Sequence, residues 1–458
     1  MADRVISGSD TGFMLISAGL VQLMTPGLAF FYAGLVRQKN VVTMIAQNFV
    51  SMGITTILWV FILFSLCFAE DWGSSGVVGN PMTFIGFRHM SIKEPLSGGS
   101  SGGVTAAIPG VLFGFYQCMF AVISPALMTG AFADRLRYAP WVVFLSFWLL
   151  LVYVPWCHMI WGGGVLAQMK VQDFAGGIVV HTTAGFSALA CILMLGRRGD
   201  LDQDSEALAT PHNVPLVFLG TALLWFGWFG FNAGSALSAG PLAVLAGWNS
   251  QVAAAAAMTV WTGIDWVVRG KPGLMSKCIG AIAGLATVTP CAGFVQPSCA
   301  LVLGMLSAPV CYACVALLDC LGFDDALDVW GVHGMGGVLG SILLGVLADG
   351  PECANVETAP SYCVNPGTVT ASWEQLGLQT GAVLACAVYS FVVSYILLVV
   401  IGHWIELTPS AQEQRNLDAV LHGEQAYTRM NTIERAKTFQ RQKSFLREPL
   451  VWHDAEEA

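Results

Sequence analysis

Long apolar stretches alternate with short polar segments along most of this chain. Each stretch is close to the roughly 20 residues that an α-helix needs to cross the hydrocarbon core of a bilayer. The pattern therefore predicts an all-α polytopic membrane protein with eleven transmembrane helices. The predicted spans lie near residues 12–35, 42–68, 104–131, 139–157, 174–196, 213–234, 244–268, 274–295, 299–320, 329–348 and 376–402.

Composition and charge support this class and indicate an orientation. Apolar residues make up 55% of the 458 positions and charged residues 11%, whereas a soluble domain has roughly 25% charged residues. If the N-terminus is outside, the cytoplasmic connections hold nine Lys and Arg residues and the outer ones four, as the positive-inside rule requires. We therefore expect a transmembrane domain over 1–402, an extracellular N-terminus and a cytoplasmic tail over 403–458.

One apolar span carries a histidine as its single ionisable residue. From Phe174 onward, 23 residues contain no Asp, Glu, Lys or Arg, and His181 lies among them. An ionisable side chain is costly in hydrocarbon, so His181 should face protein or water. Such residues are often functional, but a histidine that only ties two helices together by a hydrogen bond is the simpler alternative.

A second apolar span repeats this arrangement. His333 lies 152 residues after His181 and is the single ionisable residue from Val329 to Ala348. Small residues follow both histidines at the third and fourth positions, which puts a small-residue helix face beside each imidazole. Such faces allow two helices to approach closely. The sequence therefore predicts a symmetric histidine pair.

Aromatic residues and one hydroxyl are candidates for a site near the histidines. Trp228 and Ser235 are seven residues apart in span six, which predicts one shared α-helical face with Phe231 between them. Phe120 occupies the outer half of span three. Ordinary lipid-facing or interfacial packing remains the simpler explanation for any single one of these side chains.

The connection between spans four and five offers two further candidates. Trp161 stands beside three glycines, and Asp173 immediately precedes the apolar run of span five. A carboxylate in that position is simply explained as a helix N-cap, which the helix dipole favours. The alternative is a functional negative charge close to a cation site.

Other kinds of chemistry find no support in the sequence. No zinc-type Cys/His spacing occurs, and no nucleophile, base and orienting group occur together, so we expect no metal, no cofactor and no enzyme activity. Nucleic acid is not an expected partner, because no basic patch with interleaved aromatics occurs outside the tail. Cys353 and Cys363, in the predicted outer loop between spans ten and eleven, are a candidate disulfide that their spacing alone does not establish.

These residues resemble the ammonium transporter, methylammonium permease and Rhesus protein family, and its ammonium transporter branch in particular. The resemblance covers nearly the whole chain, and the motifs that carry it are long and stand in the family's order. They are TPGLAFFYAGLVRQKN, QCMF (Gln117 to Phe120) with ADRLR after it, HMIWGGG, DFAGGIVVH, WFGWFGFNAGS and DVWGVHGMGG.

The resemblance implies a fold and an assembly. It predicts a homotrimer in the lipid bilayer of the plasma membrane, in which each subunit has eleven helices and its own pore. The first ten helices would form two inverted five-helix repeats, followed by a final helix. His181 would then close the first repeat and His333 the second.

The resemblance also implies an outer site for ammonium or methylammonium. Phe120, Trp161 and Ser235 would recruit the cation, and Phe120 with Phe231 would form a gate beneath it. A small cation over aromatic faces gains about 0.5–2 kcal/mol from each ring, and a hydroxyl can accept one of its hydrogens. Recruitment of this kind is modest and reversible.

Below the gate, the resemblance implies a pore lined by Trp228, His181 and His333. Carrying the ion through an apolar pore would cost several kcal/mol, whereas neutral ammonia crosses with a far smaller penalty. Deprotonation at the outer site resolves this conflict, and the imidazoles can hydrogen-bond ammonia or relay its proton. Asp173 would be a buried carboxylate that supports the recruitment site without touching the substrate.

The tail segment LDAVLHGEQAY, from Leu417 to Tyr427, also resembles the family. In relatives this segment packs against the neighbouring subunit and couples the pores. Plant members have a regulatory threonine two residues before the histidine of the motif, where this chain has Val420, so that switch is not expected here. A cytoplasmic nitrogen regulatory protein or a kinase is the expected partner of the tail.

Two functions are therefore compared. The first is a transporter that takes up ammonium as ammonia together with a proton. The alternative is an ammonium sensor that signals through its tail with little flux. The histidine pair favours conduction, because a pure binding site would not need a lined pathway beneath it. A light-driven pump is excluded, because it needs a lysine inside a span and Lys277 lies at a cytoplasmic end.

Overall fold

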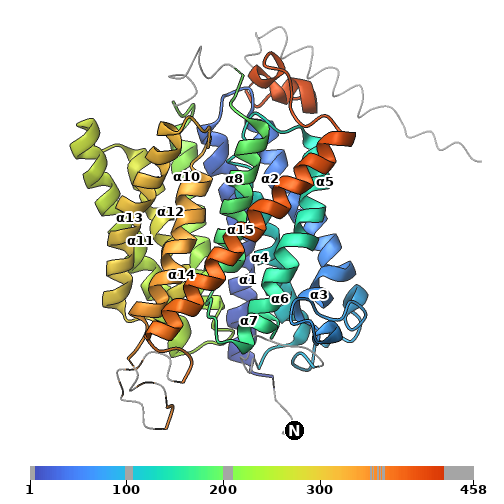
Figure 1. Cartoon of the computed structure of the whole chain (residues 1–458), viewed down its shortest axis with the longest axis vertical. Helices are drawn as coiled ribbons and strands as arrows, with labels where there is room; N and C mark the ends of the chain where they lie inside the picture. Colours follow the sequence, from blue (N-terminus) through green and yellow to red (C-terminus); the bar gives the residue numbers. More distant parts are fainter. Residues whose placement is uncertain are drawn as a thin grey trace, which may run out of the picture.

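The computed structural model describes residues 6–97, 107–199, 210–350, 353, 355–357, 361, 363 and 367–427. Within these residues, eleven helices are long and apolar enough to cross a membrane, as the sequence predicts. The same part of the chain has two isolated β-bridges and no strand. The N-terminus and the start of the tail lie at opposite ends of the helix bundle (Figure 1), as an odd number of spans requires. We call them the N-terminal end and the tail end.

Five spans are single helices and six are composite. The single helices are α1 (Gly8–Leu35), α4 (Gly110–Met128), α11 (Pro241–Arg269), α13 (Pro297–Cys320) and α15 (Trp373–Trp404). The composite spans join α2 (Val41–Leu58), η1 (Trp59–Leu63) and α3 (Phe64–Phe68); α5 (Tyr138–Trp148), η4 (Leu149–Tyr153), α6 (Val154–Trp161) and α7 (Val165–Gln168); η5 (Gly177–Thr182) and α8 (Thr183–Leu195); α10 (Val214–Trp228) and η6 (Phe229–Ala233); α12 (Leu274–Val288) and η7 (Thr289–Cys291); η8 (Trp330–Gly334) and α14 (Met335–Leu347).

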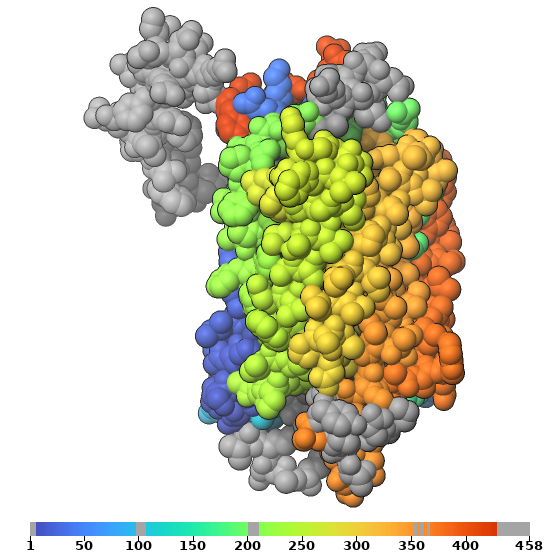
Figure 2. All heavy atoms as spheres, turned by 90° about the vertical axis from the view of Figure 1, so that its left-hand side faces the viewer, coloured from blue at the N-terminus to red at the C-terminus, as the bar shows by residue number. Residues whose placement is uncertain are grey.

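Helices from distant parts of the chain cover one another in the bundle. The last helix, α15, runs diagonally across one face and packs against α5, α8 and α14 (Figure 1). α11 and α13 run side by side on another face (Figure 2). The α4 span is the most deeply enclosed, with 89% of its most apolar window buried. A helix that is apolar all round and enclosed in this way belongs to the core, and α4 passes through the middle of the molecule.

Turns of π-helix occur in five of the composite spans: η1 and η4 lie inside their spans, η5 and η8 begin theirs, and η6 ends its span. Such a turn adds a residue to the helix and shifts the register of the residues after it. The predicted α-helical face from Trp228 to Ser235 is therefore wrong. η6 begins after Trp228 and ends at Ala233, and Ser235 lies in a turn beyond it. The hydroxyl of Ser235 still returns to this helix by donating to the carbonyl of Phe231 at 2.8 Å.

The two spans that carry the histidines cross at very short range. A Cβ on Gly185 would overlap the Cα of Gly334, and a Cβ on Gly337 would come within 2.5 Å of the carbonyl oxygen of Gly177. Both approaches are possible only without side chains, as in other close helix crossings in membranes. The small-residue faces predicted beside His181 and His333 thus do bring their helices together.

Span four is longer than the sequence pattern predicts. The predicted span ends at residue 157, but α6 continues through His158 to Trp161 and ends where Gly162 begins a glycine run. In the sequence, the polar His158 and the glycine run after Trp161 are typical of a loop, which is why the predicted span ends too early. In the structure His158 is fully buried, and its Nδ1 lies 2.9 Å from the carbonyl oxygen of Cys67. A buried partner for the imidazole explains why the helix does not end earlier.

The start of the tail docks on the helix bundle of its own chain. The Asp418 carboxylate accepts hydrogen bonds from the backbone N–H groups of Val42 and Thr43 at 3.1 and 2.8 Å, and so caps α2. The N–H of Leu417 donates to Asn40 at 2.8 Å. At the other end of the bundle Cys353 and Cys363 form a disulfide, which settles the pairing that their spacing left open.

Candidate functional site: an aromatic column above two histidines

The two histidines predicted as a pair face each other in the centre of the bundle. His181 lies in η5 and His333 in η8, and both side chains are buried. Their ring centroids are 5.3 Å apart and the ring planes differ by 17°, so the imidazoles stack nearly parallel. Both nitrogens of His181 and Nδ1 of His333 lack a hydrogen-bond partner among the described residues. Buried polar atoms usually have partners, so these nitrogens mark a place for a polar ligand.

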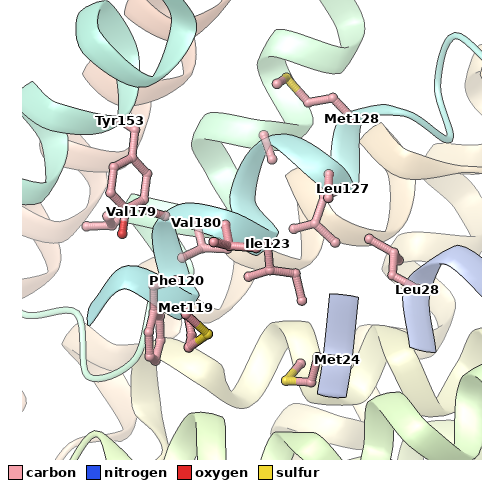
Figure 3. Close-up of a cluster of buried hydrophobic side chains, with 14 of the residues drawn as sticks. Met24, Leu28, Met119, Phe120, Ile123, Leu127, Met128, Tyr153, Val179 and Val180 are labelled. Carbon is pink, nitrogen blue, oxygen red and sulfur yellow. The ribbon is translucent and has the colours of Figure 1, made fainter. Parts of the chain in front are cut away.

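A small cavity lies beside the imidazoles. Its volume is about 10 Å³, which is the lower limit for one water-sized molecule. Apart from the histidines and two aromatics, its lining consists of apolar side chains, and Figure 3 shows Met24 and Leu28 of α1, Ile123 and Leu127 of α4 and Val180 of η5 close to one another. The lining residues are Met24, Leu28, Ile123, Leu127, Val180, His181, Leu224, Trp228, Phe231 and His333.

An aromatic column continues from the histidines toward the N-terminal end. The ring of Trp228 stacks on His181 with centroids 5.6 Å apart. Next along the column, the ring centroids of Phe120 and Phe231 lie 4.3 Å apart with the ring planes tilted by 31°, and both side chains are about 1% exposed. Trp161 then meets Phe120 edge-on at 5.7 Å and is partly exposed. The structure thus brings together Phe120, Trp161, Trp228 and Phe231, which the sequence singled out and which lie in three different spans.

Trp228 is held in place by a threonine that the sequence did not single out. Its indole Nε1 donates to the hydroxyl of Thr289 at 3.0 Å. That hydroxyl in turn donates to the carbonyl of Leu285 at 2.7 Å, which fixes its direction. Thr289 follows an apolar run as one of several similar hydroxyl residues, so no sequence signal distinguishes it.

Ser235 lies beside the aromatic column and is partly exposed. Its hydroxyl also lies 3.3 Å from that of Tyr116, another residue missed in the sequence. The Tyr116 hydroxyl donates to the carbonyls of Gly230 and Phe231 at 2.9 Å each. Tyr116 stands one helical turn before Phe120, which is the signal that could have found it. Both hydroxyls therefore anchor the backbone of η6.

Asp173 is the helix cap that its position predicts. Its carboxylate accepts four backbone N–H bonds of 2.7 to 3.0 Å from the first residues of the span, Gly176 to Val179. Burial raises the pKa of Asp173, and the four N–H groups oppose that shift. The backbone carbonyl of Asp173 also accepts from the indole Nε1 of Trp161 at 2.8 Å. One residue therefore links the π-turn of His181 to the partly exposed Trp161.

A second carboxylate occupies the equivalent place at the tail end. Asp325 lies eight residues before His333, as Asp173 does before His181. It accepts from the N–H groups of Val329 and Trp330 at 3.0 and 2.8 Å. The sequence analysis missed Asp325, although the 152-residue offset that pairs the histidines would have predicted it.

Comparison with known proteins decides the family. The sequence model of the Ammonium Transporter Family matches residues 12–427. The chain belongs to this family. Ammonium transporter Amt1 of Archaeoglobus fulgidus is 39% identical over 92% of this chain and 100% of its own length. The crystal structure of Saccharomyces cerevisiae Mep2 has a TM-score of 0.81 and 33% identity, and the match covers 93% of each chain.

A third similarity concerns the sensor alternative. A solved structure described as a sensor Amt protein matches this transporter with a TM-score of 0.77 and 25% identity, over 90% of this chain and 98% of that one. A protein described as a sensor thus has a fold similar to that of this chain. The function must therefore be argued from the column and the pore and not from the fold.

Proposed function

We propose that this transporter takes up ammonium by binding the cation at an outer aromatic site, removing a proton and conducting ammonia, with net inward movement of the proton as well. The observation that carries the proposal is the unbroken column from Trp161 through Phe120 and Phe231 to His181 and His333. It joins a partly exposed aromatic wall to a buried polar pair.

Phe120, Trp161 and Ser235 are the proposed recruitment site for ammonium or methylammonium. The edge-on meeting of the two rings leaves one aromatic face open to a cation beside them, and such a contact is worth about 0.5–2 kcal/mol. The Ser235 hydroxyl already donates to a carbonyl, so its oxygen is free to accept a hydrogen from the substrate. Aromatic binding of this kind favours a small cation that is weakly hydrated.

Phe120 and Phe231 are the proposed gate. Their rings are in contact at 4.3 Å with a tilt of 31° and almost no exposed surface, and they separate the proposed recruitment site from the cavity. A molecule can pass only when at least one ring rotates. A closed gate of this kind strips water from any molecule that enters, which penalises an ion far more than a neutral molecule.

The proposed pore consists of Trp228, His181 and His333. Its aliphatic lining offers an ion no replacement for its hydration shell, so the cation would pay several kcal/mol to enter. Ammonia is close to water in size and fits the narrow cavity. The unpartnered imidazole nitrogens can each donate or accept a hydrogen bond, so they can hold ammonia and can accept and relay the proton that ammonium releases.

Asp173 is proposed to support this site without touching the substrate. All four of its strong hydrogen bonds go to backbone N–H groups, and its backbone carbonyl holds Trp161. Its negative charge, close beneath a cation site, also lowers the energy of ammonium there. The cap fixes the direction of the π-turn that carries His181, so one residue serves both the recruitment site and the pore.

The orientation, the domains and the assembly are part of the proposal. The basic residues Arg135, Arg137 and Arg198 lie at the tail end, so that end faces the cytoplasm and the N-terminus lies outside the plasma membrane. Residues 1–402 form the transport domain and 403–458 a tail open to a regulatory protein or a kinase. The exposed apolar face of α11 and α13 (Figure 2) is available for lipid and for the partners of a homotrimer.

Current recordings test the proposal against the sensor alternative. The transporter should give saturable inward currents with ammonium and methylammonium, and much smaller ones with potassium. A sensor should bind ammonium without such currents. Phe231→Ala should reduce the selectivity for ammonium over potassium, because it opens the gate to hydrated ions. Phe226→Ala is the matched control, because Phe226 is 58% exposed on the same span, and it should behave like the parent.

A further inference from the structure

A buried histidine stands one turn before Trp161, outside the pore. His158 is fully buried in the last turns of α6, and its Nδ1 lies 2.9 Å from the carbonyl oxygen of Cys67. Its Nε2 lies 3.4 Å from a carboxylate oxygen of Asp71, whose side chain is 24% exposed on the outer loop. The Nε2 atom makes no hydrogen bond among the described residues, so its contact with Asp71 is an ion pair only when the ring is protonated.

The partners of His158 limit the forms that its ring can take. A carbonyl oxygen only accepts, so Nδ1 carries a hydrogen and donates it to Cys67. In the neutral ring Nε2 then carries a lone pair 3.4 Å from a carboxylate oxygen of Asp71, with no hydrogen between the two atoms. With a second hydrogen on Nε2 the ring is a cation beside an anion. An ion pair with Asp71 therefore requires the imidazolium form of the ring.

Asp71 also holds the chain on the far side of Trp161. Its carboxylate accepts from the N–H of Gly76 at 2.7 Å, and the carbonyl of Gly76 accepts from the N–H of Val165 at 2.8 Å. Val165 is the first residue of α7, just after the glycine run. The outer loop is thus attached to the helix before Trp161 through His158 and to the helix after it through Gly76.

The backbone after Trp161 packs closely against its neighbours. A Cβ on Gly162 would overlap the carbonyl oxygen of Cys67 and come within 2.6 Å of the Nδ1 of His158. The N–H of Gly164 donates to the carbonyl of His158 at 3.0 Å. The position of Trp161 relative to Phe120 is therefore set by how the outer loop and α6 are joined.

We propose that His158 and Asp71 are positioning residues of the recruitment site, and that their proton-dependent ion pair sets the Trp161 wall. This inference rests on the proposed role of Trp161 in recruiting ammonium. Loss of the Nε2 proton as the external pH rises removes the attraction, loosens the end of α6 and weakens substrate binding. Because neither residue reaches the pore, the maximal rate changes little.

The neighbouring titratable groups do not replace this pair. Asp71 is the carboxylate that the described residues bring to His158. Glu70, the next residue, instead accepts hydrogen bonds from two side chains of the outer loop, at 3.1 and 2.7 Å. The thiol groups of Cys67 and Cys157 on the two adjoining helices are buried and carry no carboxylate or basic group to His158. The external proton thus acts on one pair.

Three substitutions separate the two contacts of His158. His158→Asn keeps a donor at the position of Nδ1 and loses the contact with Asp71. His158→Gln keeps a donor near the position of Nε2 without the titration. Asp71→Asn keeps an acceptor for Gly76 and removes the charge. The readouts are the half-saturation for methylammonium uptake between about pH 5 and 8, where imidazole titrates, and the maximal rate per surface molecule.

In the parent, the half-saturation should rise with external pH. His158→Asn and Asp71→Asn should raise it roughly three- to tenfold at low pH and flatten its pH dependence, as expected for loss of a partly buried ion pair. Their maximal rate per molecule should change less than about twofold. His158→Gln should keep a low half-saturation with a flat pH profile. Unchanged pH profiles in both His158→Gln and Asp71→Asn would overturn the inference.

Trp161→Leu, measured in parallel, keeps this inference separate from the proposed function. If Trp161→Leu leaves the half-saturation unchanged, the recruitment site is wrong. If Trp161→Leu raises the half-saturation and Asp71→Asn does not, only the positioning role is wrong. Should His158→Asn fail to reach the cell surface, Asp71→Asn makes the same comparison from a partly exposed loop position and decides the question alone.

Discussion

Asp173 and Asp325 stand at corresponding places in the two halves of the chain, each eight residues before a pore histidine. Each carboxylate accepts hydrogen bonds from N–H groups at the start of a π-turn, and each π-turn carries the imidazole. The frame of the pore is therefore built twice, once from each end of the bundle. The surroundings of the two carboxylates, however, differ.

At the N-terminal end Asp173 is buried, accepts four N–H bonds and lies under the aromatic wall. At the tail end Asp325 accepts two N–H bonds, is partly exposed and has acidic neighbours. Burial raises the pKa of Asp325 to about 6, although the two N–H groups oppose it. Asp324, beside it, is paired with Arg198 at 2.8 Å and Arg135 at 3.7 Å.

The repeated backbone frame around the two histidines is therefore independent of the chemistry at the two ends of the proposed pathway. We call these ends the two mouths, with Asp173 at one and Asp325 at the other. Backbone caps and glycine crossings repeat, because they only have to hold two imidazoles parallel. The mouths do not repeat, because one is aromatic and the other is acidic and basic. Among the described residues, the aromatic wall lies at one end, so the proposed pathway has a distinct entrance although the histidine pair at its centre is nearly symmetric.

Removing the pore histidines should have the largest effect and would test the repeated frame with its two histidines. His181→Ala and His333→Ala should each abolish the ammonium current, and the double variant should behave like either single one, because the stacked imidazoles act as a unit. His181→Glu should retain flux with relaxed specificity, since a carboxylate still relays protons but also attracts other ions.

Surface expression must be measured together with the current in these variants. If the histidines only hold two helices together, the single Ala variants should express poorly and the double variant should be worse. Well-expressed Ala variants with undiminished, ammonium-selective current would contradict the relay.

Transport should depend more strongly on the Asp173 cap than on the Asp325 cap. Asp173→Ala should abolish transport, a larger loss than the roughly 0.5–2 kcal/mol of one helix cap explains. Asp325→Ala should reduce the rate and leave measurable transport, because it releases two N–H groups and no aromatic wall depends on it. Uptake per surface molecule is the measurement. Equal losses in the two variants would show that the caps alone matter.

The sequence predicts the repeated frame with its two histidines better than the mouths. Eleven spans follow from length and hydropathy, and the histidine pair from two lone ionisable residues in apolar runs. Both the hydropathy of the spans and the lone histidines can be read from short stretches of one sequence. Asp325 could have been found by the same reasoning, because the 152-residue offset extends beyond the histidines.

The register and the supporting contacts could not be predicted, for physical reasons. A π-turn has no composition of its own, so the face expected from Trp228 to Ser235 assumed an unbroken α-helix. His158 resembled part of a loop, because its partner at Cys67 is 91 residues away in the chain. Thr289 is one of many similar hydroxyl residues, and only its place in space brings it to Trp228.

Removing the aromatic wall should have an intermediate effect, confined to the entrance. Trp161→Leu should raise the half-saturation for ammonium and reduce its selectivity over potassium, while the maximal current changes little, because the pore is untouched. The loss of one ring corresponds to roughly a two- to thirtyfold weaker affinity. Trp248→Leu is a suitable control, because Trp248 is 57% exposed on α11. Parent values of both quantities in Trp161→Leu would remove Trp161 from the site.

The smallest effect should come from the acidic mouth and should depend on pH. Burial and the charge of Asp325 raise the pKa of Asp328 from the ordinary 3.8 to about 8. The folded protein therefore binds this proton more tightly than the unfolded chain, and the associated stability is full below about pH 4 and lost as the pH rises toward 8. Asp328 is only partly buried, so solvent screens the effect.

Asp328→Asn should accordingly raise the melting temperature of the purified protein by about 2–4 °C at pH 8 and change it little at pH 5. Asp173→Asn should do the opposite and lower the melting temperature at both pH values, because an amide oxygen cannot replace a carboxylate that accepts four N–H bonds. Melting-temperature changes of opposite sign at pH 8 would show that the carboxylate of Asp328 destabilises the fold there, whereas the carboxylate of Asp173 stabilises it. If Asp328→Asn shifted the melting temperature equally at both pH values, the two mouths would not differ in the way their carboxylates hold protons.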